Sequence, residues 1–287
     1  SVMADVQKIK ALVDEKADKF VNVANQVWST PELGFKEEKS AAALIAALES
    51  EGFKVTTGLA GIPTAFVGVW GEGHPAIALL GEFDALPSLS QEAGNDVHTP
   101  ICEGGNGHGC GHNLLGAGSL AAAVAVKDYM EQNSIKGSVH YFGCPGEEFG
   151  CGKMFMARAG AFDGIDAAFT WHPSNLNSVW GVSSLANNSI YYKFKGRTSH
   201  AAASPHLGRS ALDACELMNV GCNYLREHIL PDERIHYAYT DVGGSAPNVV
   251  QDHAQLKYFI RAPKITQVLE LIERVNDVAR GAALMTG

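Results

Sequence analysis

Apolar residues recur every three to four positions in two segments near the start of the chain. One face of the first segment carries the apolar side chains Val6, Ile9, Val13, Phe20, Ala24 and Val27. The second segment follows the turn STPELGF (29–35) and runs from about Lys36 to Glu51, where Gly52 ends it. This spacing predicts two amphipathic helices, each with one buried face.

The pattern then changes to short runs of apolar and β-branched residues. These runs cover residues 64–70, 76–83, 138–144 and 167–172. An alanine-rich segment, LLGAGSLAAAVAVKDYM, lies between the second and third runs and predicts a helix. Nearly continuous apolar strands that alternate with helices are typical of a sheet covered on both faces. We therefore expect an α/β domain, with a mixed sheet and helices on both of its faces, over residues 1–182.

Residues 183–287 follow a different order. Strands are predicted at 189–196, 234–244 and 253–262, and helices at 210–229 and 265–284. The order β-α-β-β-α supplies five of the six elements of a ferredoxin-like sandwich. The sixth, a strand, is expected after Gly287, so we interpret the chain as truncated inside this second domain.

Charge and composition narrow the classes of function. The net charge of −9 and the pI of about 5.6 argue against nucleic acid and anionic membranes as partners. The first residues lack the basic start and apolar core of a secretory signal, and no uncharged apolar run is long enough to span a bilayer. Six cysteines in a chain of this kind suit a reducing compartment, which predicts a cytoplasmic protein.

Acidic residues and a histidine stand at the ends of three predicted strands. The strand in GEFDALP runs into Glu82 and Asp84, the strand before GEEFG into Glu147 and Glu148, and the strand in TWHP into His172. Open α/β sheets place their sites at the carboxyl ends of the strands. We therefore expect these side chains to converge at one edge of the sheet.

The glycine-rich stretch GGNGHGCGHNLLG (104–116) leads into the helix after the GEFDALP strand. Taken alone, Cys110 is more often a small buried residue, and His112 a helix-start residue bonded to backbone. Together with the glutamates and His172, however, they form a Cys, His, Glu and His set that suits a first-row divalent metal. His108 is interpreted as a neighbour of this site and not as a ligand.

Adjacent carboxylates in an apolar stretch repel each other unless a cation or a proton lies between them. One of Glu147 and Glu148 can bind metal while the other takes a proton from water and passes it to a leaving group. Asp84 suits an acceptor that orients a ligand imidazole. A nucleophilic dyad of Cys110 and His112 is the competing enzyme hypothesis, and it leaves the two glutamates without a role.

The second domain carries a further group of polar residues. His200 and His206 lie in a turn between its first strand and helix, and Asn248 and Arg261 come from later strands. Arg261 suits a carboxylate clamp. For His200, Asn248 and Arg261 a structural and a functional role are both open from the residues alone, whereas His206 is interpreted as a helix-start residue.

Five motifs, HGCGHN, CPGEE, TWHP, SHAAASPHLGRSALDA and GGSAPNVVQ, occur in this order along the chain. Together they resemble the M20 metallopeptidase family, in its amidohydrolase branch, and the resemblance extends from PELGF to GAALM. It implies a metallopeptidase-like catalytic domain with an inserted ferredoxin-like lid that mediates dimerisation.

The resemblance also implies roles for individual residues. Cys110, His112, Glu148 and His172 correspond to metal ligands, and Glu147 corresponds to the catalytic general base. Two divalent metal ions, Mn or Zn, are implied as cofactors.

Further roles follow from the same resemblance. His200 corresponds to a lid histidine that reaches into the partner subunit's active site and stabilises the oxyanion. Asn248 and Arg261 correspond to lid residues that hold the substrate's carboxylate end. Asp84 matches the acidic residue after the strand, and Glu82 stands where other branches have a metal-binding histidine, so its role is left open.

The implied activity is hydrolysis of the amide bond of N-acyl or N-aroyl amino acids, with p-aminobenzoyl-glutamate as first choice. A homodimer, or a heterodimer with a related subunit, is expected through the lid. The alternatives are a dipeptidase of the same family and a non-catalytic metal-binding subunit of a hetero-oligomeric hydrolase. Family members supply a last histidine ligand near their C-terminus, so the 287-residue chain alone is expected to bind metal poorly and not to turn over.

Overall fold

The computed structural model describes the backbone of residues 2–287 and the side chains from Asp5 onward. The chain divides into two compact units. Unit 1 ends at Asn177, and unit 2 is Ser178–Gly287. The division therefore lies five residues before the boundary predicted between residues 182 and 183.

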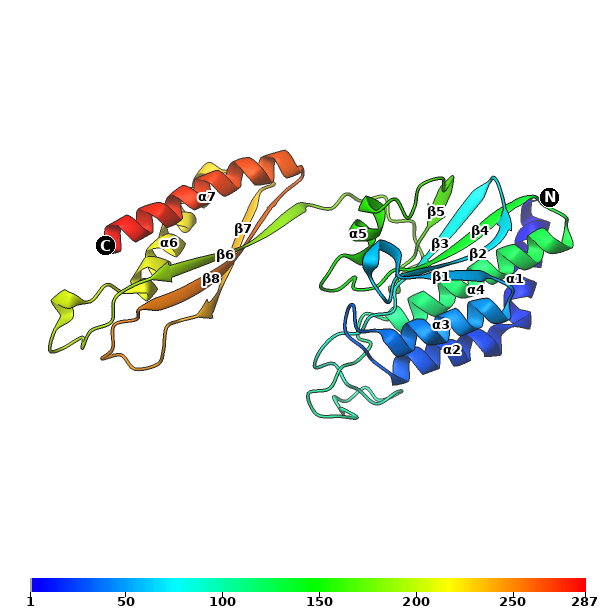
Figure 1. Ribbon diagram of the computed structural model, residues 1–287, viewed down its shortest axis with the longest axis horizontal. Helices are drawn as coiled ribbons and strands as arrows, with labels where there is room; N and C mark the ends of the chain where they lie inside the picture. Colours follow the sequence, from blue (N-terminus) through cyan, green and yellow to red (C-terminus); the bar gives the residue numbers. More distant parts are fainter. Residues whose placement is uncertain (1) are drawn as a thin grey trace. The chain divides into compact units, whose positions relative to one another are not determined.

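Unit 1 is built on a five-stranded mixed sheet (Figure 1). In sheet order its strands are β1 (Lys54–Thr57), β2 (Phe66–Glu72), β4 (Gly137–Gly143), β3 (Ala76–Gly81) and β5 (Ala167–Phe169). The strands β3, β4 and β5 run parallel to one another, whereas β1 and β2 are antiparallel additions. The four predicted strands are present, and β1 was missed because its four residues, KVTT, are short and mostly exposed.

Helices cover both faces of this sheet, unequally. Four lie on one face: α1 (Val2–Glu15), α2 (Ala17–Ser29), α3 (Glu38–Ser50) and α4 (His112–Gln132). The short α5 (Gly152–Arg158) and the 3-10 turn η1 (Leu59–Gly61) lie against the other face. The prediction of one helix before the STPELGF turn was wrong: Lys16 has a non-helical backbone, which separates α1 from α2, and Val6 is exposed.

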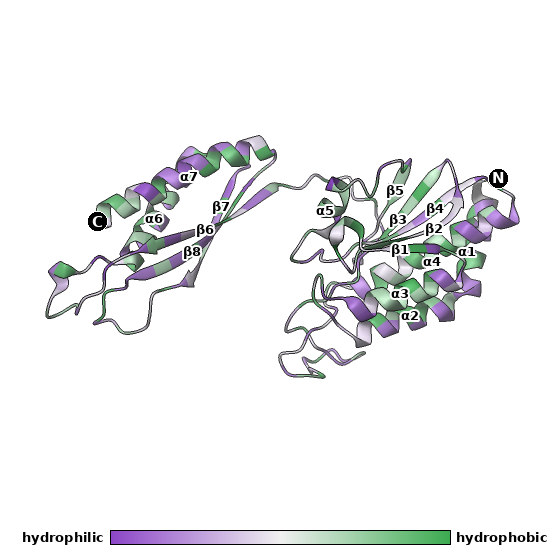
Figure 2. Ribbon diagram, in the orientation of Figure 1, coloured by the Kyte–Doolittle hydropathy of each residue, from purple (hydrophilic) through white to green (hydrophobic). Residues whose placement is uncertain are grey.

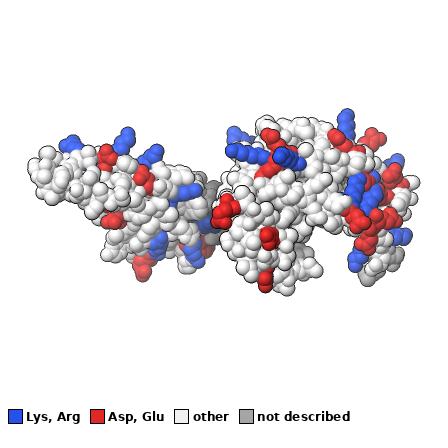
Figure 3. All heavy atoms as spheres, turned by 90° about the horizontal axis from the view of Figure 1, so that it is seen from below, with Lys and Arg blue, Asp and Glu red and all other residues white. Residues whose placement is uncertain are grey.

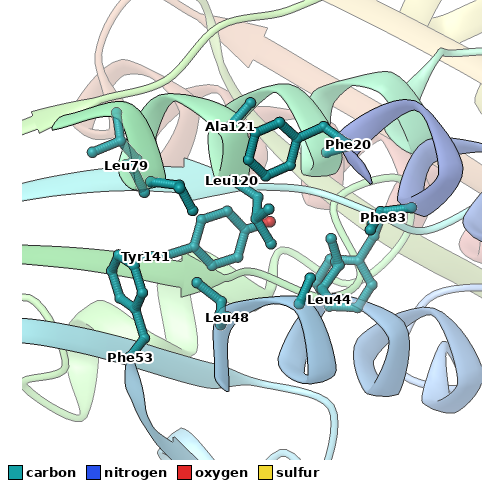
Figure 4. Close-up of a cluster of buried hydrophobic side chains, with 14 of the residues drawn as sticks. Phe20, Leu44, Leu48, Phe53, Leu79, Phe83, Leu120, Ala121 and Tyr141 are labelled. Carbon is teal, nitrogen blue, oxygen red and sulfur yellow. The ribbon is translucent and has the colours of Figure 1, made fainter. Parts of the chain in front are cut away.

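Alternating strand residues explain the two apolar layers. Leu79 of β3 and Tyr141 of β4 pack toward α2, α3 and α4, as Figure 4 shows. Ala78 and Phe142, one position along each strand, face the opposite cluster around Met156 of α5. Successive side chains of a strand point to opposite faces, so a buried sheet requires apolar residues at every position.

Unit 2 consists of β6 (Ala186–Lys195), α6 (Ala211–Leu225), β7 (Arg234–Asp241), β8 (His253–Ala262) and α7 (Ile265–Thr286), with 3-10 turns at η2 (Pro205–Leu207) and η3 (Arg226–His228). Its sheet is antiparallel in the order β6-β8-β7. The buried face of α7, which carries Val268 and Val275, packs into the unit 2 core, and Figure 2 shows the alternation of polar and apolar residues along this helix. The predicted order β-α-β-β-α is the order observed.

No described helix has both the length and the apolar composition that crossing a membrane requires. On the face drawn in Figure 3, acidic and basic side chains lie interspersed. All six cysteines are free thiols, and Cys215 and Cys222 are buried in the unit 2 core.

Candidate metal centre

The parallel strands of unit 1 bring four polar segments to one edge of the sheet. Glu82 and Asp84 follow β3, Glu147 and its neighbour follow β4, and His172 lies three residues beyond β5. The fourth segment is the glycine-rich stretch before α4, and His112 is the first residue of that helix. Parallel strands end at the same edge, so residues far apart in sequence meet there.

His112 lies at the centre of the group. Its Nε2 is 3.1 Å from Glu82 Oε2, 3.6 Å from Glu147 Oε2 and 3.7 Å from Glu148 Oε1. Cys110 Sγ lies 3.3 Å from His172 Nε2, and the rings of His112 and His172 are 5.7 Å apart. The structure thus brings together all four candidate ligands and the candidate general base.

Hydrogen bonds fix which nitrogen of each histidine faces the group. His112 Nδ1 lies 2.9 Å from Asp84 Oδ1 and 3.0 Å from the Asp84 carbonyl oxygen. His172 Nδ1 lies 2.9 Å from the carbonyl oxygen of Pro173. Carbonyl and carboxylate oxygens only accept, so each Nδ1 carries a proton and each Nε2 offers its lone pair inward. Asp84 also accepts a hydrogen bond from the Glu148 backbone N–H at 2.9 Å, which links the loops after β3 and β4.

The donor atoms fit a bound cation. Three buried atoms at the centre, Glu82 Oε2, His112 Nε2 and Glu148 Oε1, have no hydrogen-bond partner among the described residues. Buried polar atoms are normally paired, and an unpaired one is costly. Two ligand groups lie here, each with its atoms within 4.8 Å of one another: Cys110, His112 and His172, and Glu82, His112 and Glu147. The two groups overlap at His112, whose Nε2 has one lone pair and can therefore bind one ion at a time.

The raised pKa values of the acidic groups at this site also favour a bound cation. Burial, together with the charges of Glu148, Glu147 and Glu82, raises the pKa of the Cys110 thiol to about 12. Burial and the neighbouring carboxylates Glu82 and Glu148 also raise the pKa of Glu147. Several acidic groups therefore share a space with too little positive charge, and a divalent cation would favour the ionised forms of these ligands.

Glycines allow the loops to approach closely. Gly111 has a positive φ of 81°, and a Cβ there would lie 3.0 Å from Pro173 Cγ. A Cβ at Gly118 of α4 would lie 2.8 Å from the ring of Trp171, whose Nε1 donates to the Leu115 carbonyl oxygen at 3.3 Å. The residues on either side of His172 therefore seat it against the start of α4.

Two residues of the site were not assigned from the sequence. Glu82, whose role was left open, lies nearest to His112 Nε2, and the Lys153 ammonium of α5 donates to the other oxygen of Glu82. A lone lysine shortly after the GEEFG turn was the available signal. His108 is not part of either ligand group: its Nε2 lies 3.0 Å from the Val27 carbonyl oxygen, and burial lowers its pKa to about 4.

Two candidate segments of unit 2 are neighbours, and the third lies apart from them. His200 forms an isolated bridge with Val249, and the Asn248 carbonyl accepts from the Ala201 N–H at 2.9 Å, so the His200 and Asn248 segments are neighbours. Arg261 lies near the far end of β8, which begins five residues after Asn248. At roughly 3.3 Å per residue, the eight steps from His253 to Arg261 span about 26 Å. One copy of unit 2 therefore does not bring Arg261 to the other two.

The chain is similar to known proteins along nearly its whole length. The chain is 51% identical, over 98% of its length, to one subunit of the p-aminobenzoyl-glutamate hydrolase of Escherichia coli, and 32% identical over 96% to Xaa-Arg dipeptidase of Mus musculus. It covers 59% and 62% of these two proteins, so it spans about three fifths of the curated relatives it matches.

Two solved structures share the fold. A dinuclear metal binding peptidase of the M20 family from Bacillus subtilis superposes with a TM-score of 0.65 over 97% of this chain and 72% of its own, at 20% identity. An aminobenzoyl-glutamate utilization protein from Klebsiella pneumoniae gives 0.68 over 97% and 75%, also at 20% identity. The profile of peptidase family M20/M25/M40 matches residues 78–283, a span that contains every candidate ligand. The chain therefore belongs to peptidase family M20/M25/M40.

Proposed function

We propose that this protein is a metal-dependent amidohydrolase that cleaves the amide bond of N-acyl or N-aroyl amino acids, with p-aminobenzoyl-glutamate as first choice. The observation that carries the proposal is the buried group around His112, in which three unpartnered donor atoms and a more exposed glutamate face one another. The name of the Escherichia coli relative supports the choice of substrate.

Cys110, His112, Glu148 and His172 would hold two divalent ions, Mn or Zn, and Glu82 is close enough to take part. Such ions polarise an amide carbonyl and make water a usable nucleophile near neutral pH. Thiolate and imidazole ligands favour zinc, whereas carboxylates also suit manganese.

The two adjacent glutamates differ in exposure in a way that matches two roles. The side chain of Glu148 is 17% exposed and that of Glu147 is 43% exposed. Glu148 would hold metal, while Glu147, which faces the open side and has a raised pKa, would take a proton and deliver it to the departing amine. Asp84 would keep the His112 ring in its ligand orientation through the hydrogen bond to Nδ1.

His200 has the geometry of a neutral donor. Its Nδ1 accepts from the backbone N–H groups of Ala202 and Ala203 at 3.2 and 3.0 Å, so Nε2 carries the proton. An exposed Nε2–H can stabilise a developing oxyanion, and we assign this role to the His200 of a partner subunit. The distance between the His200 and Asn248 segments and Arg261 supports a dimer, because residues at opposite ends of one sheet can meet at a single substrate only if two copies contribute.

Arg261 would hold the carboxylate of the amino-acid half. Its buried Nε has no hydrogen-bond partner among the described residues, and Arg234 of β7 lies directly opposite it in the sheet. Like charges in such a pair are destabilising, so an anion between them would be favourable. A substrate with two carboxylates, such as a glutamate amide, fits this pair of arginines.

The test uses the full-length protein loaded with Mn²⁺ or Zn²⁺, without any partner protein. Release of glutamate from p-aminobenzoyl-glutamate is expected, alongside a panel of other N-acyl amino acids and dipeptides. Glu147→Gln should lower kcat by about a hundred- to ten-thousandfold and leave the metal content unchanged. The control Glu72→Gln alters an exposed carboxylate of β2 and should have no effect.

The results separate the alternatives. Turnover that survives Glu147→Gln would contradict the role given to Glu147. Preferred cleavage of dipeptides would favour a dipeptidase, as in the Xaa-Arg dipeptidase relative. Metal binding without turnover until a related subunit is added would favour a non-catalytic subunit.

A further inference from the structure

Residues 31–37, which lie between α2 and α3, contact three of the four loops that carry the candidate site residues. The Pro31 carbonyl oxygen accepts from Asn106 Nδ2 at 3.2 Å, in the glycine-rich stretch before His112. The Glu32 carbonyl oxygen accepts from the Ala85 N–H at 2.8 Å, in the loop after β3. Glu37 contacts the loop after β4. This segment contains no candidate ligand, yet it is hydrogen-bonded to three loops that carry candidate site residues.

The Glu37 contact is buried. The residue has no exposed surface, and its Oε2 accepts from the Gly146 N–H at 3.2 Å while its Oε1 accepts from Thr64 Oγ1 at 2.7 Å. Burial raises the pKa of Glu37 to about 7, although these hydrogen bonds oppose the rise. A buried carboxyl group is costly to a fold unless hydrogen bonds or a charged partner compensate for its lost hydration. Here the bond holds the Pro145–Gly146 peptide, one residue before Glu147.

Close backbone packing also holds the loop from 144 to 150 against residues 34–37. A Cβ on Gly34 would lie 2.9 Å from Gly146 Cα. Gly146 has a positive φ of 65°, and a Cβ there would lie 2.8 Å from the ring of Phe35, while one on Gly150 would lie 1.9 Å from it. The loop from 144 to 150 therefore rests on residues 34–37 with no room for a side chain between them.

We propose that residues 31–37 position the metal centre, and that Glu37 is the positioning residue that sets the backbone of the loop carrying Glu147 and Glu148. The inference rests on the proposed function for the roles of those two glutamates. A metal ligand must be held in its orientation by its surroundings, and residues that do this without touching the metal typically change metal affinity ten- to a hundredfold when altered. Glu37 does so through the main chain, one peptide before the glutamate pair.

Three variants of the full-length protein test the proposal. Glu37→Ala removes both hydrogen bonds. Glu37→Gln keeps both, since the amide oxygen can accept from Gly146 N–H and the amide nitrogen can donate to Thr64 Oγ1. The matched control is Ser119→Ala, which deletes the buried hydrogen bond from Ser119 Oγ to the Leu80 carbonyl oxygen at 2.8 Å, away from this loop.

Two measurements are made on each variant: Zn²⁺ affinity by competition with a chromophoric chelator, and hydrogen exchange of the peptide containing residues 144–150. For Glu37→Ala we expect about tenfold weaker Zn²⁺ binding and about tenfold faster exchange in this peptide. Glu37→Gln should restore both to within about threefold of the parent, and Ser119→Ala should change neither.

Equal behaviour of Glu37→Ala and Ser119→Ala in both measurements would overturn the proposal. Should Glu37→Ala fail to fold, Thr64→Val replaces it, since it releases one side of the Glu37 carboxyl; exchange that accelerates elsewhere but not in residues 144–150 would then overturn it. A parent protein that binds no Zn²⁺ or Mn²⁺ would contradict the proposed function, and the exchange of residues 144–150 would still decide the role of Glu37.

Discussion

In unit 1 the strands β3, β4 and β5 run parallel, so the residues after each of them gather at one edge of the sheet. In unit 2 neighbouring strands of the sheet are antiparallel, so β8 begins opposite the end of β6, and the His200 and Asn248 segments are separated from Arg261 by most of the length of β8. The direction of the strands thus decides whether one copy of a unit can assemble a site by itself. Loops that follow parallel strands lie together at one edge of the sheet. Loops that follow antiparallel strands are divided between its two ends.

The interiors of the two units differ accordingly. Twelve polar or charged residues are buried among the described side chains, and Asn219 is the one that belongs to unit 2. It accepts a hydrogen bond from Tyr258 at 2.6 Å and donates to Tyr239 at 3.2 Å, so it is satisfied within the core. Among the described residues, unit 1 gathers three buried atoms without a hydrogen-bond partner, Glu82 Oε2, His112 Nε2 and Glu148 Oε1, at one point. The buried atoms of unit 2 without such a partner, Ser199 Oγ and Arg261 Nε, lie on separate segments, so they form no comparable cluster.

The largest expected effect tests the central histidine of unit 1. His112→Ala should lower the affinity for Zn²⁺ or Mn²⁺ by more than about a hundredfold, because His112 belongs to both ligand groups. Equilibrium dialysis with metal analysis measures this change. His98→Ala, an exposed histidine in the connection between β3 and α4, is the control and should retain full affinity. Equal affinity in both variants would remove His112 from the site.

Truncation of a buried side chain in unit 2 should lower the stability of that unit and leave the metal affinity unchanged. Leu256 of β8 is fully buried, and Leu256→Ala should lower the free energy of unfolding of unit 2 by about 2–5 kcal/mol through the lost contacts and the cavity. Calorimetry should show a lower melting transition, while the metal affinity stays within about twofold of the parent. A parallel loss of metal affinity would show that unit 2 is more than a scaffold.

An ion-pair cluster on unit 1, away from the site, should respond to acid. Burial alone would raise the pKa of Glu51, but hydrogen bonds from Lys16 and Lys19 lower it to about 2. A carboxyl group whose pKa is lower in the folded than in the unfolded state contributes stability above its unfolded pKa of about 4.3, and this is lost as the pH falls toward 2.

Up to about 3 kcal/mol of the unfolding free energy of unit 1 should therefore disappear between about pH 5 and pH 2 on account of Glu51. Denaturant titrations at several pH values measure it. Glu51→Gln should be less stable at pH 7 and should flatten this part of the curve. An unchanged slope would show that the lysines do not stabilise the carboxylate.

The smallest expected effect tests the substrate contact proposed for Arg261 of unit 2. Arg261→Met should raise KM for p-aminobenzoyl-glutamate by roughly ten- to a hundredfold, the value of a charged hydrogen bond, with little change in metal content. Lys257→Met alters a cation on the same face of β8 and serves as the control. If both variants behave alike, Arg261 acts through general charge and not through a specific contact.

The sequence was sufficient for the elements with long, regular patterns. The strands of the unit 1 sheet apart from β1, the helices α3, α4, α6 and α7, and the order of unit 2 all follow from hydrophobic periodicity. It failed where the pattern was short or interrupted: the polar KVTT strand, the break at Lys16, and α5. Lys16, at the helix break, forms ion pairs with Glu51 and Asp128, which lie far along the chain and leave no signal in the local hydrophobic pattern.

The sequence by itself determined which residues could form a site, because Cys110, His112, Glu147, Glu148 and His172 all stand at strand or helix ends of an α/β pattern. Only the tertiary structure decided how they are arranged. In the fold, Glu82 lies beside His112, and Lys153 donates a hydrogen bond to Glu82. Buried Glu37 accepts a hydrogen bond from the backbone of the loop just before the glutamate pair. The physical reason is that periodicity reports local burial, whereas a pairing between distant loops depends on strand direction and on where each turn brings its backbone.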